Sequence, residues 1–450
     1  MSNSRAAWRS GGILCIVIVC AACMVYYHLA LFVPRAHEIR AGQGYGNGYS
    51  FGADFYPIWR TSREGLLHHR NPYAPEMTRQ IQMGLFGRPL DTRNPVAPFD
   101  YRAFAYPAFT DILFWPLCVP PFPEVRIVVA LILPAITAIS IVLWTRILRL
   151  RPGPMMLTAL ILLTLSSYAV LEGLFAEQMG LLVGFLLAAA LAALAKGRLF
   201  LSGSLLALTL IKPQMTLMAA AYLLFWSLAR WRARWRSIAG FTCVSALLVT
   251  SSSLVWPHWI PEWLRIIFGY RQYSTPPLVS YLVGTQMGSW LGPILIAVLL
   301  GGALAVAWRM RCASPTSIEF LLTISAVLAI TAITLLPGHA VYDHIVLLPG
   351  VILIALTWRD YMASLSFRVI LAVTALALVW QWITAPIVIA ARPMVSAAFF
   401  STLLTLPIRT AASIPFGVCA LLGLMLWQGH RRKLTLTEKA PIAKPEAIIL

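Results

Sequence analysis

Carboxylates are scarce in this chain. Of its 450 residues, 16 are Asp or Glu against 35 Lys and Arg, and hydrophobic residues make up 59% while charged residues make up only 11%. No soluble fold could bury so much apolar surface, so the composition excludes that class and indicates a polytopic helical membrane protein. The excess of cations does not indicate nucleic-acid binding, because the Arg residues stand in short connections between apolar segments, where they act as topology signals.

Other absences reduce the number of possible functions. The sequence has no Gly-rich phosphate loop, which disfavours a nucleotide-driven transporter. Five of the seven cysteines fall inside apolar segments, and Cys20-x-x-Cys23 has no partner His or second pair. Neither a disulfide framework nor a zinc site is therefore predicted. We expect no cofactor, and no internal repeat of fixed period is present.

The apolar segments predict an all-α transmembrane bundle of about twelve spans. They lie near residues 11 to 33, 124 to 145, 155 to 175, 179 to 195, 199 to 211, 213 to 229, 237 to 256, 289 to 308, 318 to 336, 345 to 358, 367 to 386 and 410 to 428. The segments at 199 to 211 and 345 to 358 are shorter than the roughly 17 residues that a crossing needs, so re-entrant helices are an alternative there. We expect one membrane domain, 1–433, and a disordered tail, 434–450.

The basic clusters predict the orientation. If the N-terminus is cytoplasmic and the first span is an uncleaved anchor, nearly every cluster falls on the cytoplasmic side, as the positive-inside rule requires. These clusters are Arg146 to Arg151, Lys196 to Arg198, Arg230 to Arg236, Arg309 to Arg311, Arg359 and Arg431 to Lys433. Both termini are then cytoplasmic, and the opposite face receives a long loop, 34–123, and the turns at 177–178, 212 and 337–344.

The loop at 34–123 is rich in aromatic residues and Pro, and it predicts helices that lie along the membrane. Within 54–66 the apolar residues recur at helical spacing, while the charged residues Arg60, Arg63 and Glu64 are expected to face away from them.

Asp54 is the most informative carboxylate, because it stands where this amphipathic stretch begins. Asp just before a helix is a favoured N-cap, which stabilises by roughly 1 kcal/mol. A carboxylate at the boundary of water and membrane also suits a general base that takes a proton from an acceptor hydroxyl. The two interpretations are compatible.

Lys212 interrupts an apolar run in Ile211-Lys212-Pro213-Gln214. One interpretation is a Lys that snorkels to the outer headgroups. The other is a Lys that faces a cavity and binds an anion with a lipid tail, such as a polyprenyl phosphate, with Pro213 marking a break between two half-spans.

Two further segments on the same face are polar. Glu177-Gln178 closes a turn, either as a plain connection or as a contact for a hydroxylated ligand. The segment 337–344 gathers two His, one Tyr and one Asp. Metal binding is an alternative there, but phosphate or sugar contact is favoured, because no second cluster completes a coordination set.

The order of several short motifs resembles glycosyltransferase family 87, whose members are GT-C-type membrane enzymes related to polyprenyl-phosphate-mannose-dependent mannosyltransferases. The motifs are Asp54-Phe55 and Trp59, Glu64-Gly65-Leu66-Leu67, Asn71-Pro72-Tyr73, Phe104-Ala105-Tyr106-Pro107, Phe114-Trp115-Pro116-Leu117, Glu177-Gln178, the Lys212-Pro213 pair, and Tyr342-Asp343-His344. The usual Gly-Gln-x-Asn turn appears as Glu177-Gln178-Met179-Gly180, and the usual Tyr-Pro-Pro as Tyr106-Pro107-Ala108, which leaves the sugar and the acceptor open.

The resemblance implies a hexosyltransferase of the bacterial plasma membrane that moves a sugar, mannose first, from a polyprenyl-phosphate donor to a glycan or glycolipid hydroxyl on the extracytoplasmic face, with inversion. Asp54 matches the family's proposed base. The phosphate is assigned to Lys212, His339 and His344, and the substrates to Glu177, Gln178, Tyr106, Tyr342 and Asp343, with no metal. A flippase or transporter of lipid-linked saccharides is the alternative, and a ligase using a diphosphate donor is a third, although such a ligase normally has its large outer loop late in the chain.

Overall fold

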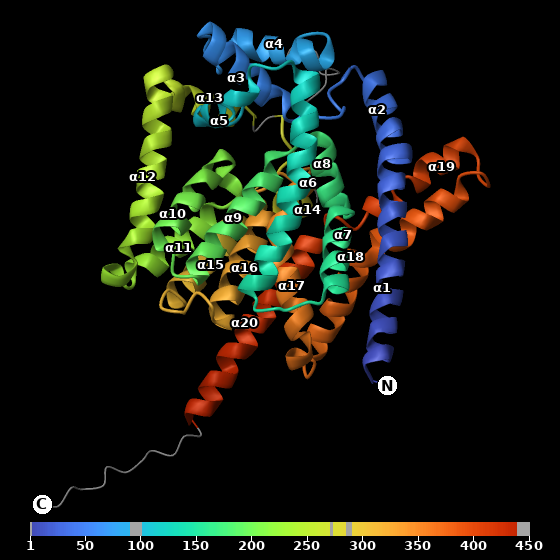
Figure 1. Cartoon of the computed structure of the whole chain (residues 1–450), viewed down its shortest axis with the longest axis vertical. Coiled ribbons are helices and arrows are strands. Elements are labelled where there is room, and N and C mark those ends of the chain that lie inside the picture. The colour runs from blue at the N-terminus through green and yellow to red at the C-terminus, as the bar shows by residue number, and fades with distance from the viewer. Residues whose placement is uncertain (1, 91–100, 271–272, 285–289, 439–450) are drawn as a thin grey trace, which may run out of the picture.

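The computed structural model describes residues 2–90, 101–270, 273–284 and 290–438, and in these residues the chain is helical, with one isolated bridge between Pro277 and Pro337. Most helices run along one direction, and several short ones lie across one end of the bundle (Figure 1). The N-terminal end of α1 lies at the opposite end (Figure 1). The all-α class expected from the sequence is confirmed for this part of the chain.

Six helical stretches in the described residues are long and apolar enough to cross a membrane. They are α1 (Ser2–Tyr26) continued through a π-helix (Tyr27–Phe32) and α2 (Val33–Gly42), α6 (Phe122–Ile147), α12 (Trp231–Val255), α15 (Leu291–Arg309), the stretch Val341–Tyr361 that contains α17 (Leu348–Thr357), and α18 (Leu365–Ala391). A seventh arises if α7 (Pro154–Leu165) and α8 (Tyr168–Ala176), bent by 63°, form one span. Length and composition thus support fewer crossings than the twelve expected.

The remaining apolar stretches have 17 residues or fewer: α9 (Met179–Ala195), α10 (Leu199–Leu208) with the turn after it, α11 (Leu217–Leu228), α16 (Ile318–Thr334), the stretch Ala397–Ile408 that begins with α19 (Ala397–Leu403), and the part Ile414–Gly429 of α20 (Ile414–Glu438). α10 and α11 form a hairpin, because Leu199 and Trp226, at its two open ends, line one cavity. Helices of 10 and 12 residues reach only about 15 and 18 Å, roughly half of a hydrocarbon layer. The re-entrant alternative therefore describes this segment better than two full spans.

Close packing of α10 on α12 holds the hairpin in place. A Cβ added to Gly203 would lie 1.9 Å from the Ser237 carbonyl oxygen, and one added to Gly240 would lie 2.1 Å from the Phe200 carbonyl oxygen. Glycine at these two positions lets the backbones approach as closely as small residues allow in membrane helices. α9 and α16 form the centre of the core, since most of their residues are buried.

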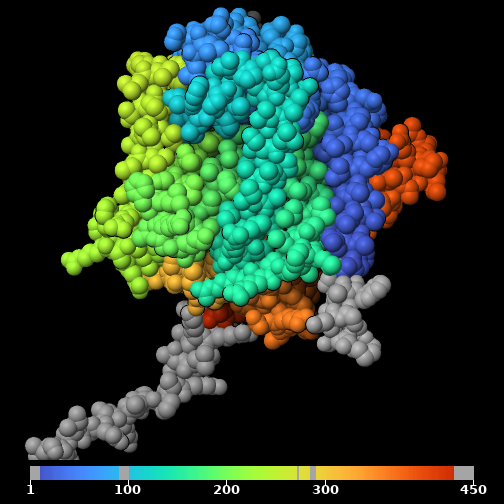
Figure 2. Space-filling view, viewed as in Figure 1, coloured from blue at the N-terminus to red at the C-terminus, as the bar shows by residue number. Residues whose placement is uncertain are grey.

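The long loop forms the helices that lie across one end: α3 (Tyr56–His68), α4 (Pro75–Phe86) and α5 (Phe109–Leu113), with α13 (Trp259–Tyr270) from a later connection. α14 (Leu278–Gly284), from that same connection, packs on α15 and α16. Figure 2 shows the segment from α3 to α5 covering that end of the molecule. α3 confirms the amphipathic helix expected at 54–66. Its Glu64 does not face away, however, because it is 7% exposed and pairs with Arg60 at 3.2 Å and Arg70 at 3.3 Å.

α20 ends at Glu438, so the first residues of the tail expected to be disordered, 434–438, are helical. The rest of that tail, 439–450, lies outside the described residues.

Candidate active site

Backbone hydrogen bonds fix Asp54 against the end of α8. The N–H of Gly52 donates to the Phe175 carbonyl at 2.9 Å, and the N–H of Asp54 donates to the Ala176 carbonyl at 3.1 Å. The last carbonyls of a helix lack partners within it, so these two bonds satisfy α8 while they position the loop. Gly52 has φ +76°, and a Cβ there would lie 2.9 Å from Glu177 Oε2.

The side chain of Asp54 begins a chain of polar contacts, which we call the polar network: Arg102, Asp54, Gln178, Lys212 and Asp343. Arg102 pairs with Asp54 Oδ1, and Gln178 Nε2 donates to Asp54 Oδ2 at 2.7 Å. Lys212 Nζ donates to Gln178 Oε1 at 2.9 Å and to Asp343 Oδ1 at 2.6 Å. Two cations and two carboxylates alternate along it, joined by the neutral amide of Gln178.

Asp54 is not the N-cap of α3. That position belongs to Phe55, with no side-chain cap bond, and the Asp54 carboxylate is turned to Arg102 and Gln178 instead. The capping interpretation is therefore wrong. Burial acts to raise the pKa of Asp54, but the Arg102 guanidinium, with the hydrogen bonds from Arg102 and Gln178, holds that pKa below its ordinary value. The side chain is 12% exposed, so it is ionised and close to solvent.

Arg102 is a member of the network that sequence reasoning missed. It has φ +43°, a conformation that a residue with a side chain rarely adopts, and its Nη2 also donates to the Gly48 carbonyl at 3.0 Å. Glu177, with φ +56°, is another such residue beside the network. Strained backbone of this kind persists where the surrounding structure imposes it and is concentrated at functional sites.

Lys212 lies at the tip of the α10–α11 hairpin and is 7% exposed, so it does not snorkel to a headgroup layer. Its ammonium meets the buried Asp343 and lies 4.9 Å from the centre of the Tyr342 ring. Asp343 packs on the first turn of α9, where a Cβ added to Gly180 would lie 2.2 Å from Asp343 Oδ1. The positive end of the α9 dipole therefore faces this part of the network.

Glu177 lies beside the network without joining it. Both of its carboxyl oxygens are buried and without a hydrogen-bond partner. Burial raises the pKa of Glu177 to about 8, and Arg126 lowers it only in part, so the group is mostly neutral at pH 7.

Tyr106, His339 and His344 are the remaining candidate residues. Burial raises the pKa of Tyr106 well above its ordinary value, and the nearby carboxylates of Asp54 and Asp343 add to that shift. His339 is exposed, and its Nδ1 is 2.7 Å from Thr275 Oγ1. His344 is buried and not joined to the network. In the described part of the chain, no three His, Cys, Asp or Glu side chains group to hold a metal ion.

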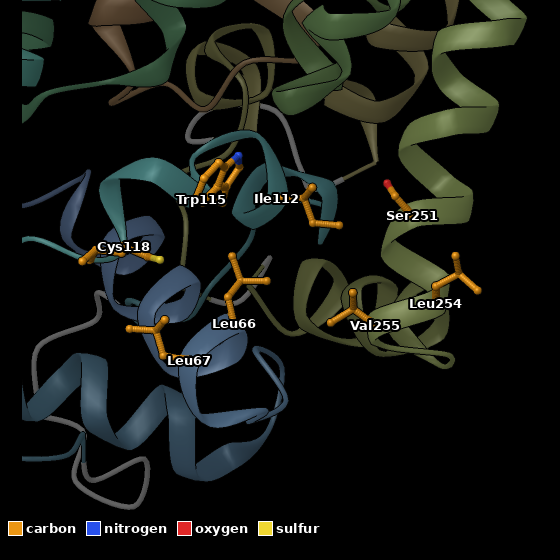
Figure 3. A pocket seen from close by; sticks show the side chains of 9 residues that line it. Leu66, Leu67, Ile112, Trp115, Cys118, Ser251, Leu254 and Val255 are labelled. Atoms are coloured by element: carbon orange, nitrogen blue, oxygen red, sulfur yellow. The ribbon is translucent and has the colours of Figure 1, made fainter.

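An apolar groove of about 540 Å³ lies between the loop helices and the end of α12 (Figure 3). Leu66 and Leu67 of α3, Ile112 of α5, and Leu254 and Val255 of α12 line it. No residue of the polar network contributes to its lining, so the groove suits a hydrocarbon chain and not the reacting groups.

A helical bundle with loop helices across one end, and a buried network of paired carboxylates and cations, defines an integral membrane protein with a preformed polar site. The model of glycosyltransferase family 87 matches residues 104–337, just over half of the chain, so this protein belongs to that family and is a membrane glycosyltransferase. No curated protein and no solved structure matches the chain. Tyr106, Gln178 and Lys212 lie inside the matched residues, whereas Asp54 and Asp343 lie outside them.

Proposed function

We propose that this glycosyltransferase moves a hexose, with mannose as the first candidate, from polyprenyl phosphate to a hydroxyl acceptor, and that Asp54 is the general base. The observation that carries the proposal is the polar network. It joins an ionised, partly exposed carboxylate and a buried ammonium to the two polar atoms of one Gln178 amide. A proton acceptor and a phosphate partner are thus close enough to act on one bound sugar.

Lys212 and Arg102 are the proposed partners of the donor phosphate. In the structure each cation is paired with a carboxylate, so an arriving phosphate competes with Asp343 for Lys212 and with Asp54 for Arg102. The first turn of α9 adds the positive end of a helix dipole. His339, exposed at the edge of the site, remains a proposed phosphate contact, and so does His344, which is buried and follows Asp343 in the chain.

We expect Asp54 to become a stronger base when the donor phosphate competes with it for Arg102. A carboxylate held by Arg102 has a lowered pKa and is a weak base. When Arg102 turns to the donor phosphate, the pKa of Asp54 rises as the donor binds. The acceptor oxygen then forms a bond to the anomeric carbon while the bond from that carbon to the phosphate oxygen breaks. The acceptor proton goes to Asp54, and polyprenyl phosphate leaves as the dianion, with inversion at the anomeric carbon.

The lipid part of the donor has a place in the same scheme. α3 begins at Tyr56, two residues after Asp54, and its far end contributes Leu66 and Leu67 to the apolar groove (Figure 3). A polyprenyl chain running along α3 would reach the groove while its phosphate stays at the network.

The site is proposed to face the extracytoplasmic side of a bacterial plasma membrane, with both termini in the cytoplasm. The support is the distribution of cations, since the Arg-rich connections lie at the end of the bundle opposite the network. Twelve crossings would require every short helix to be counted as a span. With the α10–α11 hairpin counted as re-entrant, ten remain, an even number that keeps both termini on one side of the membrane.

The test uses purified protein with radiolabelled polyprenyl-phosphate mannose and an alkyl mannoside acceptor. We expect free polyprenyl phosphate to appear together with a glycosylated product of inverted anomeric configuration. The rival function, a flippase for lipid-linked saccharides, predicts an intact donor that moves across liposomes without release of polyprenyl phosphate. An intact donor under conditions where the protein is folded would overturn the proposal.

A further inference from the structure

A second cavity, with a partly polar lining, lies at the end of the bundle far from the network. It has a volume of about 450 Å³ and is formed where α9 and α11 end, where α10 and α12 begin, and by the connection between α15 and α16. Leu194 and Leu199 form an apolar part of its lining, and Arg230, Arg234, Ser314 and Thr316 form a polar part. The cavity therefore suits a ligand that is apolar on one side and anionic on the other.

Arg234 supplies a fixed positive charge to this cavity. It is 6% exposed, and its guanidinium lies 3.7 Å from the centre of the Trp226 ring. Its Nη1 donates to the carbonyl oxygens of Trp226 at 2.5 Å and of Arg311 at 3.1 Å. Both acceptors are neutral, and among the described residues no carboxylate forms an ion pair with this guanidinium. A buried cation held without a counter-charge is costly, and a bound anion would relieve that cost.

Arg230 places a second guanidinium beside the first. The N–H of Arg234 donates to the Arg230 carbonyl at 3.0 Å, so the two residues are one helical turn apart and their like charges repel. Arg230 is exposed at the cavity. Ser314 and Thr316, whose hydroxyl oxygens lie 3.4 Å apart, line the same cavity and can donate hydrogen bonds without adding charge. Two adjacent guanidinium groups with nearby hydroxyls match the oxygens of a phosphate group.

The surrounding surface indicates where that phosphate comes from. The three connections that form the cavity carry eight cations and one carboxylate, Glu319, across the segments 194–199, 226–237 and 308–319. Trp231, Trp235 and Trp308 at this end are about half exposed. Exposed Trp marks the headgroup layer of a membrane, and basic pockets between membrane helices at that level bind anionic lipids.

We propose that this cavity binds the phosphate headgroup of an anionic phospholipid from the leaflet at the N-terminal end of the bundle. Arg230 and Arg234 pair with the phosphate, Ser314 and Thr316 donate to its remaining oxygens, and Leu194 and Leu199 contact the start of the acyl chains. This site is separate from the polar network, and it does not depend on which sugar or acceptor the enzyme uses.

The test measures equilibrium binding of short-chain phosphatidylglycerol to the full-length protein in a zwitterionic detergent, with short-chain phosphatidylcholine and inorganic phosphate as the comparison ligands. We expect phosphatidylglycerol to bind well above the other two. Arg230→Gln should weaken it about tenfold or more, because a charge-assisted contact is lost. Arg232→Gln removes the same charge from another face of the same helical turn, where the side chain is exposed and does not line the cavity, and it should weaken binding less than threefold.

The cavity also allows a variant that keeps every charge. Thr316→Val removes one hydroxyl at nearly constant volume, and it should weaken phosphatidylglycerol binding severalfold while the melting temperature stays unchanged. Equal losses in Arg230→Gln and Arg232→Gln would mean diffuse attraction to a basic surface and would overturn the site. Inorganic phosphate binding as tightly as the lipid would overturn the lipid assignment in favour of a soluble phosphate compound. An absence of binding by either ligand would overturn the proposal altogether.

Discussion

Asp54→Asn tests the proposed base, and the structure sets what this change does to stability. Both neighbours of the carboxylate, the Arg102 guanidinium and the Gln178 amide nitrogen, are donors. An Asn side chain offers one oxygen and one donating NH₂ group, so one of the two contacts becomes donor against donor. A hydrogen bond between charged groups contributes about 1.5–3 kcal/mol. Because Asp54 is 12% and Arg102 15% exposed, water replaces part of it, and we expect a loss of about 1–2 kcal/mol.

The effect on transfer should be far larger than the effect on folding. Removal of a general base lowers the rate by about 10²–10⁴-fold, whereas a loss of about 1–2 kcal/mol in a protein of this size lowers the melting temperature by only a few degrees. The assay is transfer of labelled mannose at saturating donor, per mole of folded protein, at a temperature well below the melting transition.

Asp111→Asn is the matched control. Asp111 is a fully buried carboxylate of α5 that accepts from Thr61 Oγ1 at 2.8 Å and Ser62 Oγ at 3.0 Å, outside the polar network. Burial raises the pKa of Asp111 well above its ordinary value, so the substitution exchanges one neutral group for another. It should change stability by no more than a similar amount and leave the turnover of the folded protein within a few fold. An Asp54→Asn protein that is folded and transfers sugar at near the normal rate would refute the assignment, and Glu177 and Asp343 would be the next carboxylates to test.

Three further predictions follow from the site and the topology. Lys212→Ala should weaken donor binding by tenfold or more, measured as the apparent affinity for polyprenyl-phosphate sugar. It should also destabilise the fold, because the buried Asp343 loses its cation. Unchanged donor affinity would make Lys212 purely structural. The folded protein holds a proton on Glu177 up to pH about 8, whereas the unfolded chain releases it near its ordinary pKa, so stability should fall as pH rises from about 5 to 8. Glu177→Gln should flatten that dependence of the melting temperature, and an unaltered slope would show that the pKa of Glu177 is not raised. Arg79 and Lys196 are both exposed, and in a cysteine-free background Arg79→Cys and Lys196→Cys should react with an impermeant thiol reagent from opposite sides of the membrane. Equal labelling of both from outside would reject the proposed orientation.

The features that the sequence predicts well are those with strong local signals. The apolar runs specify the helices, and the scarcity of carboxylates draws attention to Asp54 and Asp343, which the structure joins through Gln178 and Lys212. Lys212 was recognisable because an ammonium inside an apolar run needs a partner. The sequence could not identify that partner, since Asp343 is 131 residues away along the chain.

The features that the sequence did not predict depend on contacts between distant segments. Arg102 pairs with a residue 48 positions earlier, and it does not stand out in a loop that contains many Arg residues. The same contact explains why the capping prediction for Asp54 failed, because Arg102 and Gln178 compete successfully for the carboxylate. Glu64 was expected at the surface, but two Arg side chains neutralise it and allow its burial.

The short α10–α11 hairpin has a consequence for the bilayer itself. Its outer side carries exposed apolar residues, including Phe200, Leu217 and Leu228, yet its helices reach only about half of the usual hydrocarbon thickness. Lipids beside such a short apolar surface adapt by thinning the membrane locally, which lowers the headgroup layer toward Lys212. The proposed lipid-linked phosphate would then have less hydrocarbon to cross before it met the ammonium. On that proposal the thickness of the host membrane affects turnover, and short-chain lipids should favour the enzyme over long-chain ones.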